Sequence, residues 1–338
     1  MAKTLEKRHP GAHASTPTRI PARGWWQVVL RAVQRSGQDR VPLVGAGVAF
    51  FAFLSLFPAL IAAVLVYGLV SDPADITAHV TQLSEVLPDE ATALVTDQLH
   101  ALASDDDGRL SIGLAISLGV ALFSASTGVV NLVTAVNLAY EEQQRTGLVR
   151  RRLEALAFTA GAIVTLALLL ALLAVVPLTV TAEGVPGWLV DVGRWLGVGV
   201  VSALALAALY RYAPERRDPR LPWVSVGAVV ATAIWILASA GFSLYVTYAA
   251  GYARTYGTLA GVVVLLVWLW LTSMAVLLGA EINAEAEHQT DADTTVGPER
   301  PRGDRDAVKA DTAVGRPDPE HSPEPGTHGA HEAPRTRR

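Results

Sequence analysis

The chain has 338 residues, of which 51% are hydrophobic and 17% charged, and its formal net charge is −4. This composition is too apolar for an ordinary soluble domain, and a net charge near zero gives no reason to expect a nucleic-acid partner. The chain has no cysteine, which excludes disulfides, thiolate catalysis and cysteine-bound metals.

The first forty residues divide into two parts. Residues 1–22 are polar and lack periodicity, so we expect a disordered cytoplasmic arm. Over residues 24–40, the apolar side chains of Trp26, Leu30 and Val33 fall on one helical face, opposite glutamines and arginines. This pattern predicts an amphipathic helix at the membrane interface, where tryptophan suits the headgroup layer and arginine suits anionic lipid. A solvent-exposed cytoplasmic helix is the alternative.

Six long apolar segments follow, and a helix needs about 20 such residues to cross the hydrocarbon core. The sequence therefore predicts an all-α, polytopic transmembrane bundle within a membrane domain at 23–284. Its expected spans cover residues 41–70, 110–140, 155–180, 188–210, 221–250 and 256–282.

Two further segments lie outside the spans. Residues 71–108 carry two short amphipathic patterns, which predict a helical segment over the outer mouth of the bundle. Residues 285–338 are rich in proline, glycine, histidine and charge, and we expect a disordered cytoplasmic tail.

The basic residues predict the orientation of the bundle. Residues 1–40 and the second and fourth loops contain 16 lysines and arginines, whereas the first, third and fifth loops contain 3. Such residues gather in the cytoplasmic loops of membrane proteins. Both termini should therefore face the cytoplasm, as an even number of spans also requires.

Polar but uncharged side chains mark the first two spans. Pro58 should kink the first span, and Ser55 lies close enough to satisfy part of the freed backbone. The second span carries a polar stripe of Ser124, Thr127, Asn131 and Asn137. The stripe either packs closely against another helix or lines a cavity, and the pattern leaves both interpretations open. No Asp, Glu, Lys, Arg or His lies within the charge-free stretches of the spans, with Asp191 and Arg194 expected in the outer headgroup layer, and this argues against a proton-driven antiporter.

Three further candidate positions lie near the ends of the last two spans. Tyr245, Tyr248 and Tyr256 form either an aromatic belt at the outer interface or an entrance for an amphiphilic ligand. Gly257 begins a GxxxG pattern that favours close helix contact. Glu281 closes the last span, where a hydrated carboxylate is the plainer interpretation and an ion pair with an inner-loop arginine the alternative.

Motifs for catalysis are missing from the sequence. It contains no HExxH, no Walker sequence and no serine nucleophile elbow, and its histidines lie in the tails and the outer segment. We therefore expect no catalytic residues, no cofactor and no metal ligands.

Five sequence blocks, taken together, resemble the YihY/BrkB family of bacterial inner-membrane proteins, historically labelled ribonuclease BN. These blocks are GAGVAFFAFLSLFPAL (45–60), SASTGVVNLVTAVNLAYEEQQR (124–145), ALYRYAP (208–214), YVTYAAGYARTYGTLAG (245–261) and LLGAEINAE (277–285). The resemblance implies six spans with cytoplasmic termini in the plasma membrane, and it implies no reaction. A metal nuclease would need histidines and carboxylates gathered at one site.

The residues favour a non-enzymatic protein that transports or handles a lipid or other amphiphile through an uncharged polar cavity. An inner-membrane scaffold protein is the alternative, and a ribonuclease, as the old family label suggests, is a remote one. Membrane lipids are the expected partners. A protein partner at the cytoplasmic tails or the outer segment and assembly as a homo-oligomer both stay open.

Overall fold

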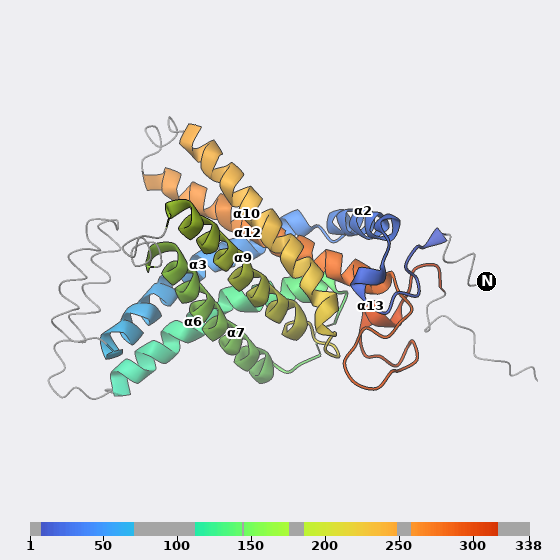
Figure 1. Cartoon of the computed structure of the whole chain (residues 1–338). Helices are drawn as coiled ribbons and strands as arrows, with labels where there is room; N and C mark the ends of the chain where they lie inside the picture. Colours follow the sequence, from blue (N-terminus) through green and yellow to red (C-terminus); the bar gives the residue numbers. More distant parts are fainter. Residues whose placement is uncertain (1–7, 71–111, 144, 176–185, 249–257, 317–338) are drawn as a thin grey trace, which may run out of the picture.

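A computed structural model describes residues 8–70, 112–143, 145–175, 186–248 and 258–316 of the chain. The elements in these ranges are helices, and six of them are long and apolar enough to cross a membrane. The prediction of an all-α bundle with six spans is therefore confirmed (Figure 1). The expected outer segment at 71–108 lies outside the described residues.

The observed helices follow the predicted spans with shifted ends. In chain order they are α3 (Val41–Val70), α6 (Ile112–Ala139), α7 (Leu148–Leu170), α9 (Gly187–Tyr212), α10 (Leu221–Tyr248) and α12 (Thr258–His288). A π-helical turn, η2 (Ala171–Val175), continues α7. Three shorter elements lie outside the spans: η1 (Pro17–Arg19), α2 (Ala22–Gln38) and α13 (Val308–Asp311).

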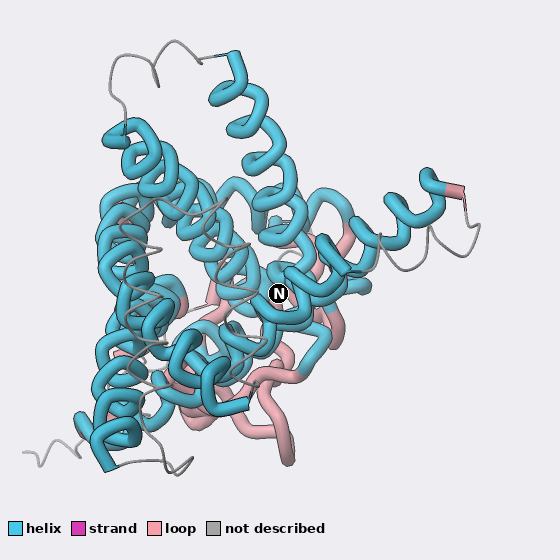
Figure 2. The backbone as a smooth tube through the Cα atoms, turned by 90° about the vertical axis from the view of Figure 1, so that its left-hand side faces the viewer, coloured by secondary structure: helices cyan, strands magenta, loops and turns pink. Residues whose placement is uncertain are grey.

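The six long helices converge at one end and stand apart at the other. At the first end, which we call the terminal end, residues 8–22 and 285–316 pack against the bundle (Figure 1). The principal core lies there and includes Val136, Tyr210 and Ala280. Figure 2 views the bundle from the opposite end, where the helix ends are spread apart. Long helices that keep apolar side chains on their outer faces are typical of a membrane environment.

Two glycines bring α10 and α12 into close contact near the terminal end. A Cβ atom on Gly227 would overlap the carbonyl oxygen of Gly279, so the two backbones touch where both residues lack a side chain. The Asn283 amide joins the same crossing, because its Oδ1 accepts the Gly227 N–H at 2.7 Å and its Nδ2 donates to the Val224 carbonyl at 3.1 Å. From α9, the Tyr210 hydroxyl donates to the Val276 carbonyl at 2.7 Å. Small residues and polar crosslinks of this kind hold membrane helices together where the hydrophobic effect is weak.

A similar contact joins α3 to α6. The Ser55 hydroxyl accepts the Gly128 N–H at 2.9 Å and donates to the Phe51 carbonyl at 2.7 Å. A Cβ atom on Gly128 would lie only 3.2 Å from the Cα of Ala52. Helix α3 continues through Pro58, and the Ser55 hydroxyl interacts with Phe51 and Gly128.

The segments expected to be disordered are ordered over much of their length. Ala14 and Ile20 of the arm are buried with Val28 of α2, Trp223 and Ala286. Residues 289–316 also take defined positions, and they include the fully buried Gln289 and Lys309. Residues 8–22 and 285–316 therefore take defined positions where the composition predicts disorder, because backbone and side-chain hydrogen bonds connect them to each other, to α2 and to the loops after α6 and α9. Residues 1–7 and 317–338 lie outside the described residues.

Replacing Gly227 with alanine tests the α10–α12 crossing. The added methyl group has no room, and overpacking of this kind costs about 1–3 kcal/mol of stability. We expect a lower melting temperature in detergent micelles, measured by the loss of helical circular dichroism.

Gly241→Ala on the same helix is the matched control, since a Cβ there meets nothing within 4 Å. It should leave the melting temperature unchanged or raise it slightly, because alanine favours helix more than glycine by about 1 kcal/mol or less. Equal effects of the two substitutions would contradict the close crossing.

Candidate functional site

A network of buried charges occupies the terminal end, and we call it the terminal network. Its first half links α2, α12 and the segment after α12. Arg31 donates to the Glu285 carboxylate at 2.7 Å and to the Gln289 amide oxygen at 2.6 Å. The Lys309 ammonium lies 3.0 Å from Glu285 and 3.1 Å from Glu141. Because Glu285 and Lys309 are almost completely buried, each charge depends on its partners for the solvation that water would supply.

The second half of the terminal network is a bidentate pair between Arg216 and Glu287. The two guanidinium-to-carboxylate distances are 2.7 and 2.8 Å, and both side chains have zero exposure. Thr294 donates a further hydrogen bond to Glu287 at 2.9 Å, and the Arg216 guanidinium lies 4.3 Å from the ring centre of Tyr140. Burial raises the pKa of the Tyr140 hydroxyl, so this phenol stays neutral beside the pair.

Glu281 lies one helical turn before Glu285 and is also buried. The expectation of a hydrated carboxylate is wrong, because its exposed fraction is 0%. The alternative of an ion pair with an inner-loop arginine is not found among the described residues, and neither carboxylate oxygen accepts a hydrogen bond. The close packing of α12 against its neighbours, which the sequence does not reveal, excludes water from this position.

A pocket of about 360 Å³ lies between α3 and α6 close to the terminal network. Helix α3 contributes an apolar wall, and α6 contributes part of the polar stripe. Its lining residues are Val44, Gly47, Val48, Phe51, Asn131, Thr134, Ala135, Asn137, Leu138 and Glu142. The structure therefore brings Asn131 and Asn137 to one pocket. It also adds Glu142, a carboxyl group that the expectation of an uncharged cavity did not include.

The two asparagines of this pocket make different contacts. The Asn131 amide donates to the Thr127 carbonyl of its own helix at 2.9 Å and is half-buried. Asn137 is 1% exposed, accepts the Glu215 N–H at 2.8 Å and donates to the Ala213 carbonyl at 3.2 Å. Asn137 therefore joins α6 to the loop after α9, whereas Asn131 makes no side-chain hydrogen bond to another helix among the described residues.

The other predicted site residues are scattered. Ser124 and Thr127 are half-buried on α6, away from the lining of the α3–α6 pocket. Tyr245 and Tyr248 are exposed at the end of α10. Tyr256 and Gly257 lie outside the described residues, so their proposed roles stay predictions.

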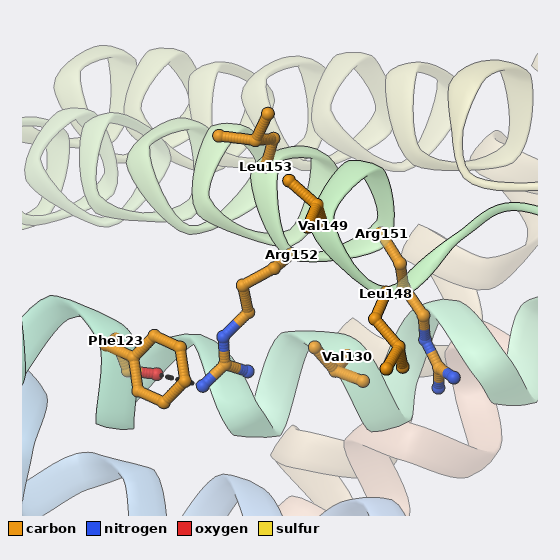
Figure 3. Close-up of a pocket in the computed structure, with 7 residues that line it drawn as sticks. All are labelled: Phe123, Val130, Leu148, Val149, Arg151, Arg152 and Leu153. Atoms are coloured by element: carbon orange, nitrogen blue, oxygen red, sulfur yellow. Dashed lines mark hydrogen bonds between the residues drawn. The ribbon is translucent and has the colours of Figure 1, made fainter.

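A second pocket of about 640 Å³ lies between α6 and α7 (Figure 3). Its walls are apolar apart from two arginines, and the lining residues are Phe123, Val130, Leu148, Val149, Arg151, Arg152 and Leu153. Both guanidinium groups extend from α7 toward α6 (Figure 3). Arg152 lies 3.5 Å from the centre of the Phe123 ring and donates to the Phe123 carbonyl at 2.8 Å. We call this pocket the α6–α7 groove.

Sequence reasoning missed the residues of the terminal network. Their partners lie far apart in the chain, since 254 positions separate Arg31 from Glu285 and 168 separate Glu141 from Lys309. One local signal was available. The acidic residues at the end of α12 alternate with the small residues Ala284 and Ala286. Small residues favour close contact with a neighbouring helix, so they indicate that this helix end is packed and not exposed to water.

Glu287→Gln tests the bidentate pair of the terminal network. It leaves the buried Arg216 guanidinium without a counter-charge, a change that typically costs about 3–5 kcal/mol. The melting temperature should fall sharply. Glu154→Gln is the matched control, because Glu154 pairs with the exposed Arg150 and such helix-surface pairs contribute about 0.5 kcal/mol or less. A loss as small as that of the control would show that the pair does not stabilise the bundle.

The carboxyl group of Glu142 gives a pH-dependent prediction. Burial raises its pKa from 4.5 to about 7, against the opposing effect of the Val308 N–H, which it accepts at 2.8 Å. A raised pKa means that the folded protein binds more protons than the unfolded chain between these two values. The free energy of unfolding should therefore fall as pH rises from about 4.5 to about 7.

Glu142→Gln should remove this slope, because glutamine does not titrate. Melting temperatures of both proteins across that pH interval measure the effect as a difference, which cancels the contributions of other groups. Parallel curves would contradict a raised pKa at Glu142.

Comparison with known proteins agrees with this architecture. Residues 32–304 match the family described as Virulence factor BrkB. A Bacillus subtilis protein named as ribonuclease-like, YfkH, is 32% identical over 267 residues, which cover 76% of this chain and 93% of that protein. The UPF0761 membrane protein RSc1559 of Ralstonia nicotianae is 28% identical over 279 residues, which cover 78% of this chain and 60% of that protein.

A further relative matches a shorter part of the chain. The UPF0761 membrane protein VP0125 of Vibrio parahaemolyticus is 41% identical over 98 residues, or 28% of this chain and 31% of that protein. No solved structure matches. With its family match over 32–304 and its six apolar helices, the chain belongs to the Virulence factor BrkB family and is a multi-pass protein of the bacterial inner membrane.

Proposed function

We propose that this protein binds a lipid or a similar amphiphile in the α3–α6 pocket and moves it within the membrane without chemical change. The observation that carries the proposal is the composition of the pocket wall. Asn131 contributes its amide, Thr134 contributes a hydroxyl that also bonds Val130 and Arg151, and Val44, Val48 and Phe51 contribute apolar surface to the same pocket. A ligand with a polar head and an apolar tail meets both kinds of wall at once.

The size and position of the pocket support this ligand class. Pockets for small molecules measure about 300–1,000 Å³, and the α3–α6 pocket of about 360 Å³ falls at the lower end of that range. Such a volume suits a headgroup or the first part of a chain. The rest of an amphiphile could extend along the outer faces of the helices, where large apolar side chains such as Phe50 and Leu54 are exposed.

The uneven packing of the bundle supports movement at one end. Buried ion pairs and hydrogen bonds hold the helices at the terminal end, and exposed apolar residues such as Leu204 and Leu237 lie along α9 and α10. Helix ends that few buried contacts restrain open at a low free-energy cost. In this proposal the terminal end stays fixed in the cytoplasmic leaflet while the opposite ends separate.

The placement of α2 belongs to the same proposal. Its small face, including Gly24, Val28 and Ala32, is buried, and α2 packs chiefly against α12. Its large apolar side chains, Trp26 and Val33, are exposed on the other side. An exposed apolar face flanked by arginines supports a position at the membrane surface with the termini in the cytoplasm.

Catalysis is not part of the proposal. The ribonuclease-like description belongs to the relative from Bacillus subtilis, whereas the UPF0761 relatives are named as membrane proteins. In the described part of the chain, no three histidines, aspartates or glutamates come together as metal ligands.

Gly47→Leu tests the proposal by filling the pocket. Gly47 lines it, and a Cβ atom there meets nothing within 4 Å, so a larger side chain can start from this position without a clash at Cβ. We expect the variant to lose photo-crosslinking to a phospholipid with a photoreactive headgroup, at peptides of α3 and α6, and to lose movement of a fluorescent lipid between the leaflets of proteoliposomes.

Gly161→Leu is the matched control, because Gly161 is exposed on α7 with nothing within 4 Å of its Cβ position. It should behave like the wild type. Asn131→Leu is a second variant that removes a polar group and keeps the fold, whereas Asn137 is unsuitable because its amide joins two helices. Unchanged crosslinking and lipid movement in Gly47→Leu would overturn the proposal.

A further inference from the structure

We infer that the α6–α7 groove is a separate binding site for an anionic phospholipid, with Arg151 and Arg152 holding its phosphate. The groove shares no lining residue with the α3–α6 pocket, although Arg151 donates to the hydroxyl of Thr134, which lines that pocket. The inference does not depend on the function proposed for that pocket.

Neither arginine of the groove makes a direct ion pair among the described residues. No carboxylate lies within 4.0 Å of either guanidinium, although Glu215 is near enough to interact electrostatically with Arg151, whereas the neighbouring Arg150 pairs with Glu154 at 2.9 Å. Arg151 donates to the Thr134 hydroxyl at 2.7 Å, and Arg152 donates to the Phe123 carbonyl. The Nε atoms of both arginines are buried and have no hydrogen-bond partner. Half-buried cations with unused donors are stabilised strongly by an anion that brings several acceptor oxygens.

The start of α7 adds to the positive potential at this place. Arg150, Arg151 and Arg152 occupy the first turns, where the partial positive charge of the helix favours acidic residues. The first turn contains no acidic residue, and the N-cap Gly147 provides no side-chain hydrogen bond. Three arginines in this position repel the helix dipole and one another, and a phosphate in the groove would relieve both effects.

The walls of the groove indicate that the anion carries acyl chains. Leu148, Val149 and Leu153 are 84, 77 and 62% exposed, and Phe123 on α6 is 55% exposed. A soluble phosphate would leave this apolar surface without a partner, whereas acyl chains that run along α6 and α7 would cover it. Guanidinium groups beside exposed apolar side chains suit a ligand that carries a phosphate next to acyl chains.

Native mass spectrometry of the full chain in detergent micelles tests this site. Phosphatidylglycerol is titrated into the delipidated protein, beside diacylglycerol with the same chains and inorganic phosphate. We expect wild type to retain one phosphatidylglycerol, and the double variant Arg151→Gln/Arg152→Gln to weaken its binding by about tenfold or more. Arg150→Gln removes the same charge from the same turn outside the groove and should change the affinity by less than about twofold.

A second pair of variants covers the case in which the double variant does not fold. Leu148→Glu places a carboxylate in the groove without changing either arginine, and Leu148→Gln is its neutral control. Of these two variants, only Leu148→Glu should weaken phosphatidylglycerol binding. Gly47→Leu should leave unchanged the part of the binding that is lost in the arginine double variant, and this separates the groove from the α3–α6 pocket.

Three results would overturn the inference. Diacylglycerol binding as tightly as phosphatidylglycerol would show that the phosphate is not recognised. Inorganic phosphate displacing the lipid at equal concentration would assign the groove to a soluble anion. Equal retention of phosphatidylglycerol by wild type, the arginine double variant and Leu148→Glu would place the lipid elsewhere on the protein.

Discussion

The pairing of buried opposite charges at the terminal end is the constraint on which the rest of the bundle depends. Arg216 and Glu287 have no exposed side-chain surface, so neither is solvated by water and each requires the other. Because one residue follows α9 and the other closes α12, their pairing fixes these two helices relative to each other. Glu285 does the same for α2 and for the segment that carries Lys309. Charge pairing therefore fixes the relative positions of these elements, as a large hydrophobic core does in a soluble domain.

This constraint explains why the six helices are packed unevenly. Glycine contacts and interhelical hydrogen bonds, such as those of Gly227 and Asn283, lie near the network. Farther from the terminal network, the outer faces of α9 and α10 carry exposed apolar side chains that suit contact with lipid. Both pockets with apolar walls lie on α6, one shared with α3 and the other with α7. Helix α6 is thus the element at which the two proposed binding surfaces meet.

The sequence was sufficient for the spans because the physical signal is local. An apolar run of the required length predicts a membrane helix without knowledge of its neighbours. The same local logic failed for 8–22 and 285–316, whose composition suggests disorder, since their order comes from distant partners. Glu141 lies 168 positions from Lys309, and Thr290 donates to the Ala14 carbonyl 276 positions away. It also failed for Glu281, because burial at a helix end depends on how closely the neighbouring helices pack.

The candidate site shows the same division between local and distant information. The polar stripe of the second span was visible as a helical pattern, but the sequence left packing and cavity lining as alternatives. The structure separates the two within the stripe: Asn137 joins α6 to the loop after α9, and Asn131 lines a pocket without such a crosslink. The α6–α7 groove could not be predicted, because nothing in the sequence indicates that the arginines at the start of α7 reach as far along α6 as Phe123.

The long sequence separation within the terminal network has a consequence for biosynthesis. Arg216 leaves the ribosome 71 residues before Glu287, and at about 5–20 residues per second this delay amounts to roughly 4–14 s. During that interval, five helices can already be inserted while the Arg216 guanidinium at the membrane surface has not yet paired with Glu287. The terminal network therefore forms only after residues 285–316 are translated. A nascent chain that stalls before residue 285 contains most of its spans but lacks the ion pairs that fix them relative to one another.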